Sequence, residues 1–383
     1  MNHPTIESTG NERPFRFFDN REKYLLFVTT TSEKTVIAER VGLELAYLKP
    51  TPPALKLFDA GVGNGMVFSR VLRDMHQRFP TVPFLVVGKE ISMEDTRLWL
   101  ETLADRFAEH PQTVVVLNNL YYSEAPWLQP ASPDARNRLE WHDIALEGNS
   151  AHDFSREIGK LGELLSRGWQ TRSSERTGNP IYVTPSVLVL YRRDQAFTLH
   201  NIIPTRGRYE GGYDLIIAAQ PYRSRTNADF KVAKVLGPLC KSLNANGRMV
   251  VIQSTGHDPG MEIIRKVWPR EEPFQTPRHI LINALRQELD HDESGKYSVE
   301  GASDDRALFT YHMHALPDEI GSNIGTSTLL AAWNAAVYVA QIEDERMNEV
   351  LMSGDYLDAT LSVLQRHGGL WFQDESFVVA RHH

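Results

Sequence analysis

The chain has 383 residues, of which 41% are hydrophobic, and a formal net charge of −8 with a pI near 6.0. This length suits one large domain or a core domain with sizeable insertions, and the acidic balance argues against a broad nucleic-acid-binding face. No stretch reaches the roughly 18 to 20 apolar residues of a membrane span, and the polar residues 1–13 lack the apolar core of a signal peptide. The single cysteine, Cys240, cannot form an internal disulfide, which is consistent with a reducing compartment. We therefore expect a cytoplasmic globular protein with no membrane or nucleic-acid partner.

Residues 1–50 precede the first expected strand and are rich in aromatic side chains. The segment 36–47 predicts a helix. We expect residues 1–50 to form an N-terminal cap, and residues 51–383 to form the core, with insertions at about 120–212 and 260–350.

A glycine-rich turn between a short apolar run and a helical pattern is the most informative stretch of the chain. The run beginning at Leu55 predicts a buried strand that ends at Asp59, and residues 66–79 carry apolar side chains at helical spacing. Glycines in such a turn let a ligand approach the backbone, and the following helix offers free N–H groups. A dinucleotide-binding fingerprint has the spacing Gly-x-Gly-x-x-Gly. Here the three glycines lie one residue closer, at Gly61, Gly63 and Gly65.

A second apolar run, 84–87, predicts the next strand, and Glu90 follows it. An acid at the end of the second strand is where nucleotide-binding α/β folds hold ribose hydroxyls. The sequence Asp59-Ala-Gly-Val-Gly-Asn-Gly65, together with Glu90, resembles motif I of the class I S-adenosylmethionine-dependent methyltransferases. The resemblance implies S-adenosylmethionine as the cofactor, with the acid of motif I near the methionine end and the turn beneath the ribose. The cofactor-binding residues that it implies are Asp59, Ala60, Gly61, Gly63, Asn64, Gly65, Glu90 and Ile91.

The same resemblance places an N-terminal extension over the cofactor cleft. Tyr24 thereby becomes a candidate for contact with the cofactor or the substrate.

Two residues compete for contact with the adenine ring. Asn119 follows the third expected strand, 113–117, one strand–helix unit after Glu90, and its amide could both donate and accept. Asp143 ends a later expected strand, 139–145, in a sequence that also resembles the adenine-contacting motif of the family. Spacing favours Asn119, residue chemistry favours Asp143, and both remain candidates.

Residues 120–212 are too long for one helical connection, so they predict an insertion. Within it, residues 186–191 and 196–200 predict a β-hairpin, and residues 171–182 predict an exposed polar loop. By analogy with the fold, an insertion beside the cleft shapes the substrate pocket.

The second landmark is a predicted central strand, 213–218, followed by Ala219-Gln-Pro-Tyr222 at the edge where ligands bind in open α/β sheets. Amino-nitrogen methyltransferases often carry Asn-Pro-Pro-Tyr at this position, and only the last two residues match. The resemblance implies Ala219 near the cofactor and Gln220, Pro221 and Tyr222 near the substrate, with Tyr222 able to stack on a planar or cationic acceptor.

A predicted helix, 228–243, leads into a predicted fifth strand, 244–252, and then to His257 and Asp258 at the same edge. This pair could act as a general base or orient a polar group of the substrate, so His257, Asp258 and Tyr222 are the catalytic candidates. We expect no metal site, because His312 and His314 have no third ligand at a recognisable spacing.

Near the C-terminus, residues 326–351 predict one long helix suited to a buried or interface position, through which a homo-oligomer could form. Residues 369–372 and 376–380 predict a closing β-hairpin with its turn at 373–375. A terminal antiparallel hairpin is the feature by which class I methyltransferases depart from a plain Rossmann sheet.

These observations predict an α/β Rossmann-like three-layer sandwich with a mostly parallel seven-stranded sheet and a C-terminal antiparallel hairpin. The implied activity is transfer of a methyl group in line to an O or N nucleophile, with a small molecule as the expected partner. Two alternatives stay open: an NAD(P)-dependent Rossmann oxidoreductase, and a non-catalytic cofactor-binding or regulatory protein.

Overall fold

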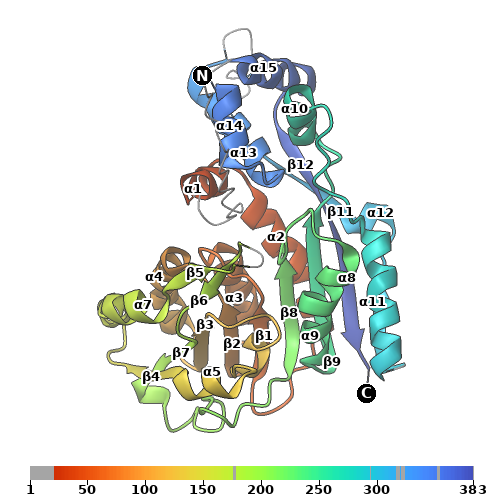
Figure 1. Cartoon of the computed structure of the whole chain (residues 1–383). Coiled ribbons are helices and arrows are strands. Elements are labelled where there is room, and N and C mark those ends of the chain that lie inside the picture. The colour runs from red at the N-terminus through yellow and green to blue at the C-terminus, as the bar shows by residue number, and fades with distance from the viewer. Residues whose placement is uncertain are drawn as a thin grey trace, which may run out of the picture.

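The computed structural model describes residues 21–175, 178–293, 295–315, 320, 324–351 and 354–382. A sheet flanked by helices forms the larger body, and a smaller, mostly helical lobe lies at one end of the sheet (Figure 1). The parallel strands β8 (Tyr213–Ala219) and β9 (Leu243–Ser254) point toward this lobe, so their carboxyl ends lie between the body and the lobe.

The main sheet contains ten strands within the described residues, in the order β10-β12-β9-β8-β1-β2-β3-β7-β4, with β11 also paired to β12. Five central strands are mutually parallel: β1 (Leu55–Asp59), β2 (Phe84–Lys89), β3 (Thr113–Asn118), β8 (Tyr213–Ala219) and β9 (Leu243–Ser254). On one side follow β12 (Trp371–Arg381), β10 (Tyr297–Glu300) and β11 (Leu308–His312), with β12 antiparallel to all three of its neighbours. The other edge consists of β7 (Ser186–Arg192), antiparallel to β3, and β4 (Glu140–Leu146).

Helices cover both faces of this sheet, because successive side chains of a strand point to opposite faces and here both sets are apolar. In β1, Leu57 belongs to the core on one face and Phe58 to the core on the other. The first face is covered by α2 (Glu33–Gly42), the 3₁₀ turn η1 (Leu43–Tyr47), α3 (Met66–Arg78), α4 (Met93–Glu109), α6 (Ala151–Gly159) and α7 (Gly162–Gly168). The second face is covered by α8 (Ala228–Lys231), the π-helical turn η4 (Val232–Leu236), α9 (Gly237–Lys241) and α11 (Arg278–Glu293). The sequence therefore predicted the three-layer sandwich correctly.

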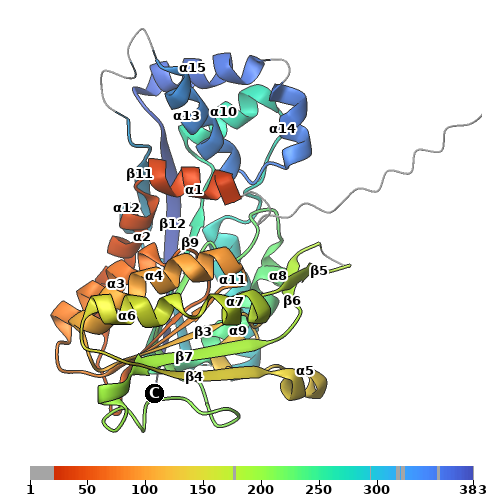
Figure 2. The same cartoon turned by 90° about the vertical axis from the view of Figure 1, so that its left-hand side faces the viewer.

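The smaller lobe joins an N-terminal helix to helices from the later part of the chain around a third apolar core. Its helices are α1 (Arg21–Thr30), α10 (Pro259–Val267), α13 (Thr326–Val339), α14 (Asp344–Leu351) and α15 (Asp355–His367). In Figure 2, α1 lies directly beneath α13, and the two helices pack against each other. The lobe therefore combines the N-terminal segment with the insertion predicted near 260–350. The described helices include none that is long and apolar enough to cross a membrane.

The short elements complete the chain: η2 (Ala125–Trp127), α5 (Pro133–Arg138), β5 (Thr171–Ser173), β6 (Pro180–Tyr182), η3 (Arg193–Gln195) and α12 (Asp304–Ala307). Cys240 is a buried free thiol in α9.

Two predicted hairpins are wrong in detail. Residues 186–200 form one strand, β7, followed by a 3₁₀ turn and further turns, because Ala196 to His200 find no neighbouring strand. The segment 171–182, predicted as a loop, instead contains the small β5–β6 hairpin.

At the C-terminus, residues 371–381 form the single strand β12, without a turn at 373–375. The polar run Asp374-Glu375-Ser376 resembles a turn in the sequence, yet it is buried between β9 and β11. The predicted antiparallel addition to the sheet is therefore present, with β9, β10 and β11 as the partners of β12. The strand β10 was not expected from the sequence, and it is one reason why the sheet exceeds seven strands.

The predicted helix 326–351 is divided into α13 and α14, with Gln341 between them at a φ of +54°. Residues Ala332 to Val337 of α13 are buried in the core of the lobe. Formation of a homo-oligomer through this segment stays a prediction.

A stack of three rings at the amino end of β2 and β3 predicts a loss of stability in mild acid. His110 stacks on Phe84 with ring centroids 4.2 Å apart, and His76 stacks on His110 at 5.0 Å. Burial lowers the pKa of both histidines to about 4, and the Arg106 guanidinium contributes at His76. The Glu109 carboxylate lies 3.3 Å from Nδ1 of His76, but it also pairs with Arg106 and does not reverse this effect.

In the unfolded chain a histidine has a pKa near 6.5, so between about pH 6.5 and 4 the unfolded state binds more protons. We expect the free energy of unfolding to fall through this window by on the order of 2 kcal/mol. His76→Phe should remove part of the pH dependence and keep the stack, because neither ring nitrogen of His76 has a hydrogen bond within the described residues. Urea unfolding of both proteins at pH 7.5, 6 and 5 measures this, and parallel pH profiles would refute it.

Candidate functional site

Two acids close neighbouring parallel strands at the centre of the sheet. Asp59 is the last residue of β1, Glu90 follows β2, and Asp59 pairs in register with Gly88. The strand order reverses direction at β1, which lies between β2 and β8. Ligands of open α/β sheets bind at such a reversal, outside the carboxyl ends of the strands.

The glycine turn is held by these two acids. Asp59 Oδ1 accepts a hydrogen bond from the Gly61 N–H at 3.0 Å, and Glu90 Oε2 accepts one from Gly63 N–H at 2.8 Å. Glu90 Oε1 also accepts from the N–H groups of Ile91 and Ser92, at 2.8 and 2.9 Å. The carboxylates thus fix the turn, and each keeps lone pairs that these bonds do not use.

Glycine is required where the turn enters helix α3. Gly65 has a φ of +79° and precedes the first residue of the helix, and a Cβ there would lie 2.3 Å from the Trp99 ring. In the same turn, Asn64 Oδ1 accepts from the N–H of Met66 at 3.3 Å. Ala60 donates its N–H to Ile217 of β8, so the turn leaves the sheet directly after Asp59.

The carboxyl group of Asp59 is buried and only partly hydrogen-bonded. Its side chain is buried, and its second oxygen, Oδ2, has no hydrogen bond with the described residues. Burial raises the pKa of Asp59 to about 7, the Gly61 N–H opposes this, and the Glu90 charge adds to it. A bound cation would favour the ionised form and offset the cost of burial.

Helix α1 brings Tyr24 onto the glycine turn. The Tyr24 hydroxyl accepts a hydrogen bond from the Asn64 N–H at 3.2 Å, and a Cβ on Gly63 would lie 2.6 Å from that oxygen. Burial raises the pKa of Tyr24 to about 12. The structure therefore places Tyr24 against the glycine turn, and its contact with a cofactor or substrate stays a prediction.

Lys34 is the cation of this site, and the sequence analysis missed it. Its Nζ lies 2.9 Å from Glu33 Oε2 and 5.6 Å from the centre of the Tyr24 ring. Burial lowers the pKa of Lys34, but the Glu33 carboxylate more than offsets this and raises it above the usual value. Lys34 also lowers the pKa of Asp59. A lone Ser-Glu-Lys sequence at the start of a weakly amphipathic helix carries no signal that could have identified it.

A polar array lies at the carboxyl ends of β8 and β9. Gln220 has a φ of +50°, uncommon for a residue other than glycine, and its Nε2 donates to Ser254 Oγ at 2.8 Å. Ser254 Oγ in turn donates to Asp374 Oδ1 at 2.9 Å. Ala219 and Tyr222 are half-buried and Pro221 is buried beside this array, so the structure places the predicted substrate residues at the expected edge.

Asp374 is the second residue that the sequence analysis missed. It lies near the start of β12, is fully buried, and its Oδ2 has no hydrogen-bond partner within the described residues. Burial raises its pKa to about 8, and the nearby charge of Glu33 adds to this. The prediction of a turn at 373–375 concealed it, because only the antiparallel pairing with β9 brings Asp374 to this edge.

The predicted pair His257 and Asp258 is not assembled as a base. His257 is exposed, whereas Asp258 caps helix α10 through Oδ1 to the Met261 N–H at 2.8 Å. Asp258 Oδ2 also accepts from the N–H of Gln373 at 3.3 Å. Both oxygens of Asp258 therefore accept hydrogen bonds from backbone N–H groups, and His257 does not contact them as a catalytic pair would.

The side chains of the two candidates for adenine contact are also hydrogen-bonded to other parts of the protein. Asn119 is buried, and its amide bonds with Gly168, Thr184 and Ser186. Asp143 is exposed on the edge strand β4, which runs opposite to β3, and it accepts a hydrogen bond from Tyr191. Asn119 thus lies beside the site in a structural role, and the structure does not bring Asp143 to this edge.

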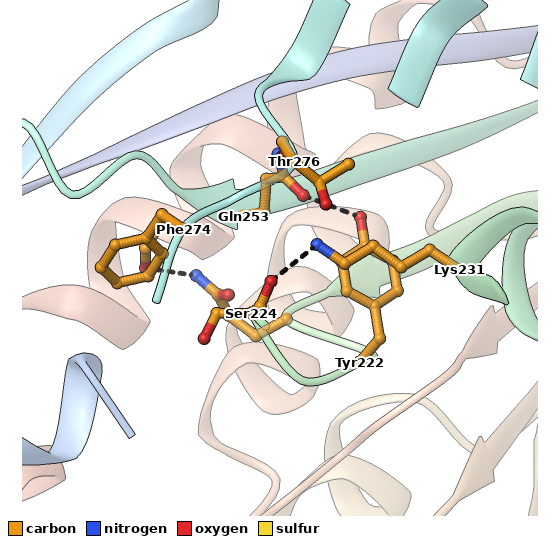
Figure 3. A pocket seen from close by; sticks show the side chains of 8 residues that line it. Tyr222, Ser224, Lys231, Gln253, Phe274 and Thr276 are labelled. Atoms are coloured by element: carbon orange, nitrogen blue, oxygen red, sulfur yellow. Dashed lines mark hydrogen bonds between the residues drawn. The ribbon is translucent and has the colours of Figure 1, made fainter. Parts of the chain in front are cut away.

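Two cavities open on the side of Tyr222. One of about 10 Å³ lies beside Tyr222 and Lys231 (Figure 3). The other, of about 200 Å³, is lined by Arg223, Arg225, Thr226, Gln341 and Glu343. The described residues include no group of three or more His, Cys, Asp or Glu side chains placed to hold a metal ion.

No protein-family model and no curated protein matches the chain. The fold is similar to that of several solved structures. A protein provisionally assigned as a sarcosine dimethylglycine methyltransferase from Galdieria sulphuraria is 8% identical, with 91% of this chain and 85% of that chain covered and a TM-score of 0.37. A geranyl diphosphate methyltransferase is 12% identical, with 91% of this chain and 77% of that chain covered and a TM-score of 0.35. The [4+2]-cyclase SpnF is 11% identical, with 97% of this chain and 87% of that chain covered and a TM-score of 0.32.

These similar structures are mostly S-adenosylmethionine-dependent methyltransferases, the superfamily that the glycine turn resembles. At such identities and TM-scores the likeness carries no argument about the reaction. One of them is named as a cyclase, so they do not share a single chemistry.

Proposed function

We propose that the chain is an S-adenosylmethionine-dependent methyltransferase that acts on an oxygen or nitrogen atom of a small molecule. The observation that carries the proposal is the pair Asp59 and Glu90, which flank the glycine turn where the strand order reverses. In the reaction the sulfonium carbon–sulfur bond breaks with its electrons left on sulfur, the nucleophile bonds to the methyl carbon, and the proton of the nucleophile is released. The protein's task is to align the two groups and exclude water.

The residues around the turn fit the two charges of the cofactor's amino-acid end. Asp59 Oδ2 would accept from the ammonium group, and Lys34 would donate to the carboxylate. Glu90 would accept from the ribose hydroxyls through the lone pairs that the backbone leaves free. Tyr24 would close over the turn and restrict water.

At the acceptor end, we propose that the nucleophile lies against Ala219 and Gln220. The array of Gln220, Ser254 and Asp374 would orient it, since these groups fix one another by hydrogen bonds. Tyr222 would border the same space. His257 and Asp258 have no part in this proposal, because the first is exposed and the second caps a helix.

The structure weakens the oxidoreductase alternative. A doubly wound dinucleotide-binding sheet is mostly parallel, whereas β12 is inserted antiparallel between β9 and β10. Together with the glycine spacing, this favours the sulfonium cofactor. The other alternative is a protein that binds the cofactor without catalysing a reaction. Transfer of label from S-adenosylmethionine to a component of a cell extract would distinguish the enzyme from such a protein.

The test is calorimetric titration with S-adenosylhomocysteine and, in parallel, with NADH. We expect binding of S-adenosylhomocysteine alone; binding of NADH alone, or of neither ligand, would overturn the assignment.

The affinity for S-adenosylhomocysteine should also depend on pH with a definite sign. The cationic amino group requires ionised Asp59, whose pKa in the free protein is raised to about 7. Affinity should therefore be constant from about pH 8 up to the pKa of the ligand's own ammonium group, and it should fall below pH 7 by up to about tenfold per pH unit. Asp59→Asn should flatten this profile, and a wild-type profile flat from pH 6 to 8 would contradict the role given to Asp59.

A further inference from the structure

Lys231 is a buried cation that the mechanism above does not use. It is the last residue of α8, only 2% of it is exposed, and its ammonium group borders the small cavity beside Tyr222 (Figure 3). Lysine is rarely buried to this extent unless it is paired.

The partners of Lys231 within the described residues leave it incompletely satisfied. Nζ donates one hydrogen bond, to the carbonyl oxygen of Ser224 at 3.2 Å, and lies 4.6 Å from the centre of the Tyr222 ring. An ammonium group has three donors, so two remain available. Burial lowers the pKa of Lys231 to about 8, against the opposing charge of Glu375.

Glu375 does not form an ion pair with Lys231. Its Oε1 accepts from Gln253 Nε2 and from the N–H of Arg278, both at 2.8 Å, and its Oε2 lies 4.0 Å from the guanidinium of Arg278. The Tyr222 hydroxyl also points elsewhere and donates to Gln253 Oε1 at 3.1 Å. Within the described part of the chain, Lys231 therefore feels the charge of Glu375 but forms no ion pair with a carboxylate.

The cavity next to Lys231 is small, and its lining is part polar and part apolar. Its volume of about 10 Å³ is close to the space that one water molecule requires, so it can hold one oxygen atom of a larger group. Its lining combines the lysine with hydroxyl and amide groups and two aromatic rings: Gln220, Tyr222, Ser224, Lys231, Gln253, Ser254, Phe274 and Thr276. Gln220 and Ser254 also belong to the array with Asp374, so the cavity adjoins the place proposed for the nucleophile.

We propose that this cavity is an anion subsite, in which Lys231 binds a carboxylate group of the methyl acceptor. The inference rests on the proposed function and narrows it to small carboxylic acids whose nucleophilic oxygen or nitrogen lies near Gln220. One unpaired cation matches the single charge of a carboxylate better than the higher charge of a phosphate, and the cavity has room for one of the carboxylate oxygens, with the rest of the acceptor outside it. The neighbouring Arg225 adds no free charge, because its guanidinium is bonded to Glu271 and to the carbonyl groups of Ala340 and Gln341.

Acetate is the probe for this subsite, and its binding to the whole chain is measured by broadening of its methyl proton resonance at pH 7. We expect saturable binding that is at least tenfold weaker in Lys231→Met, whose side chain keeps the buried apolar volume. Lys234→Met, at an exposed lysine in the adjoining turn η4, is the matched control and should bind acetate as the wild type does. Equal binding by Lys231→Met and wild type, or tighter binding of inorganic phosphate or methylammonium than of acetate, would overturn the proposal.

A measurement on the wild type covers the case in which Lys231→Met does not fold. At pH 9.5 Lys231, whose pKa burial lowers to about 8, is mostly deprotonated, whereas Tyr222 stays neutral because burial raises its pKa well above the usual range. Acetate binding should then be at least tenfold weaker than at pH 7, and it should recover when the pH is returned to 7. Binding that persists unweakened at pH 9.5 would exclude Lys231 as the anion-binding group.

Titration with S-adenosylhomocysteine separates this inference from the proposed function. Lysine-dependent acetate binding without S-adenosylhomocysteine binding would retain the anion site and reject the methyltransferase. Binding of S-adenosylhomocysteine without lysine-dependent acetate binding would reject the carboxylate subsite alone.

Discussion

Replacing Asp59 by asparagine is expected to weaken S-adenosylhomocysteine binding by about 10- to 100-fold, the range for loss of a hydrogen bond to a charged group. The substitution removes the charge and keeps the shape of the side chain. The amide oxygen of the new side chain can still accept from the Gly61 N–H, so the glycine turn should survive. The free energy of unfolding should change little or rise at pH 7, because a buried carboxyl group with a raised pKa is replaced by a neutral amide.

Glu90→Ala should reduce the affinity at least as much, and it should also loosen the turn. Three backbone N–H groups, those of Gly63, Ile91 and Ser92, lose their acceptor in this variant. Calorimetric titration of both variants gives the affinities, and circular dichroism confirms the fold. Asp74→Ala and Glu94→Ala remove acids from neighbouring helices and serve as controls, for which the affinity should be unchanged. Wild-type affinity in both Asp59→Asn and Glu90→Ala would remove the cofactor from this turn.

Gly88→Ala is expected to destabilise the protein by about 3 kcal/mol, at the upper end of the range for over-packing a core. A Cβ at Gly88 would lie 2.3 Å from Cη2 of Trp99 and 2.5 Å from Cγ2 of Val62. Trp99 is fully buried and also contacts Gly65, so it cannot move without disturbing the glycine turn. The strand and the turn therefore both depend on one indole ring.

Urea unfolding measures the effect, and Gly159→Ala is the matched control. Gly159 is in helix α6, where an added Cβ meets nothing within 4 Å, so alanine there should be neutral or stabilising by up to about 1 kcal/mol. Similar stabilities of the two variants would show that Trp99 relaxes away from Gly88.

The local pattern of the sequence was sufficient for β1, the glycine turn and α3. Buried apolar runs, a residue with positive φ at Gly65 and apolar helical spacing are determined by neighbours along the chain. The same holds for the acid that follows β2, because parallel strands place their carboxyl ends at one edge wherever they pair. Asp59 and Glu90 could therefore be assigned to a common site before the structure was known.

The sequence misassigned elements whose structure depends on distant partners. The polar residues 374–376 indicate a turn locally, but β9 and β11 on either side hold them in one strand. Conversely, residues 196–200 alternate like a strand and find no partner. Strand propensity is weak compared with the energy of cross-strand pairing and burial.

By itself the sequence determined the fold class, the glycine turn and the edge of the sheet at which ligands would bind. Only the tertiary structure decided which charged side chains reach that edge. Lys34, Asp374 and Lys231 come from a helix, a C-terminal strand and a short helical turn that are far apart in the chain, and each is held in place by contacts that no local pattern encodes. The structure also leaves His257 exposed, and it commits Asp258 to a helix cap and to the backbone N–H of Gln373. The type of a residue suggests what chemistry it could perform. Whether its side chain is available for that chemistry depends on how deeply it is buried and on which hydrogen-bond and charge partners the fold places beside it.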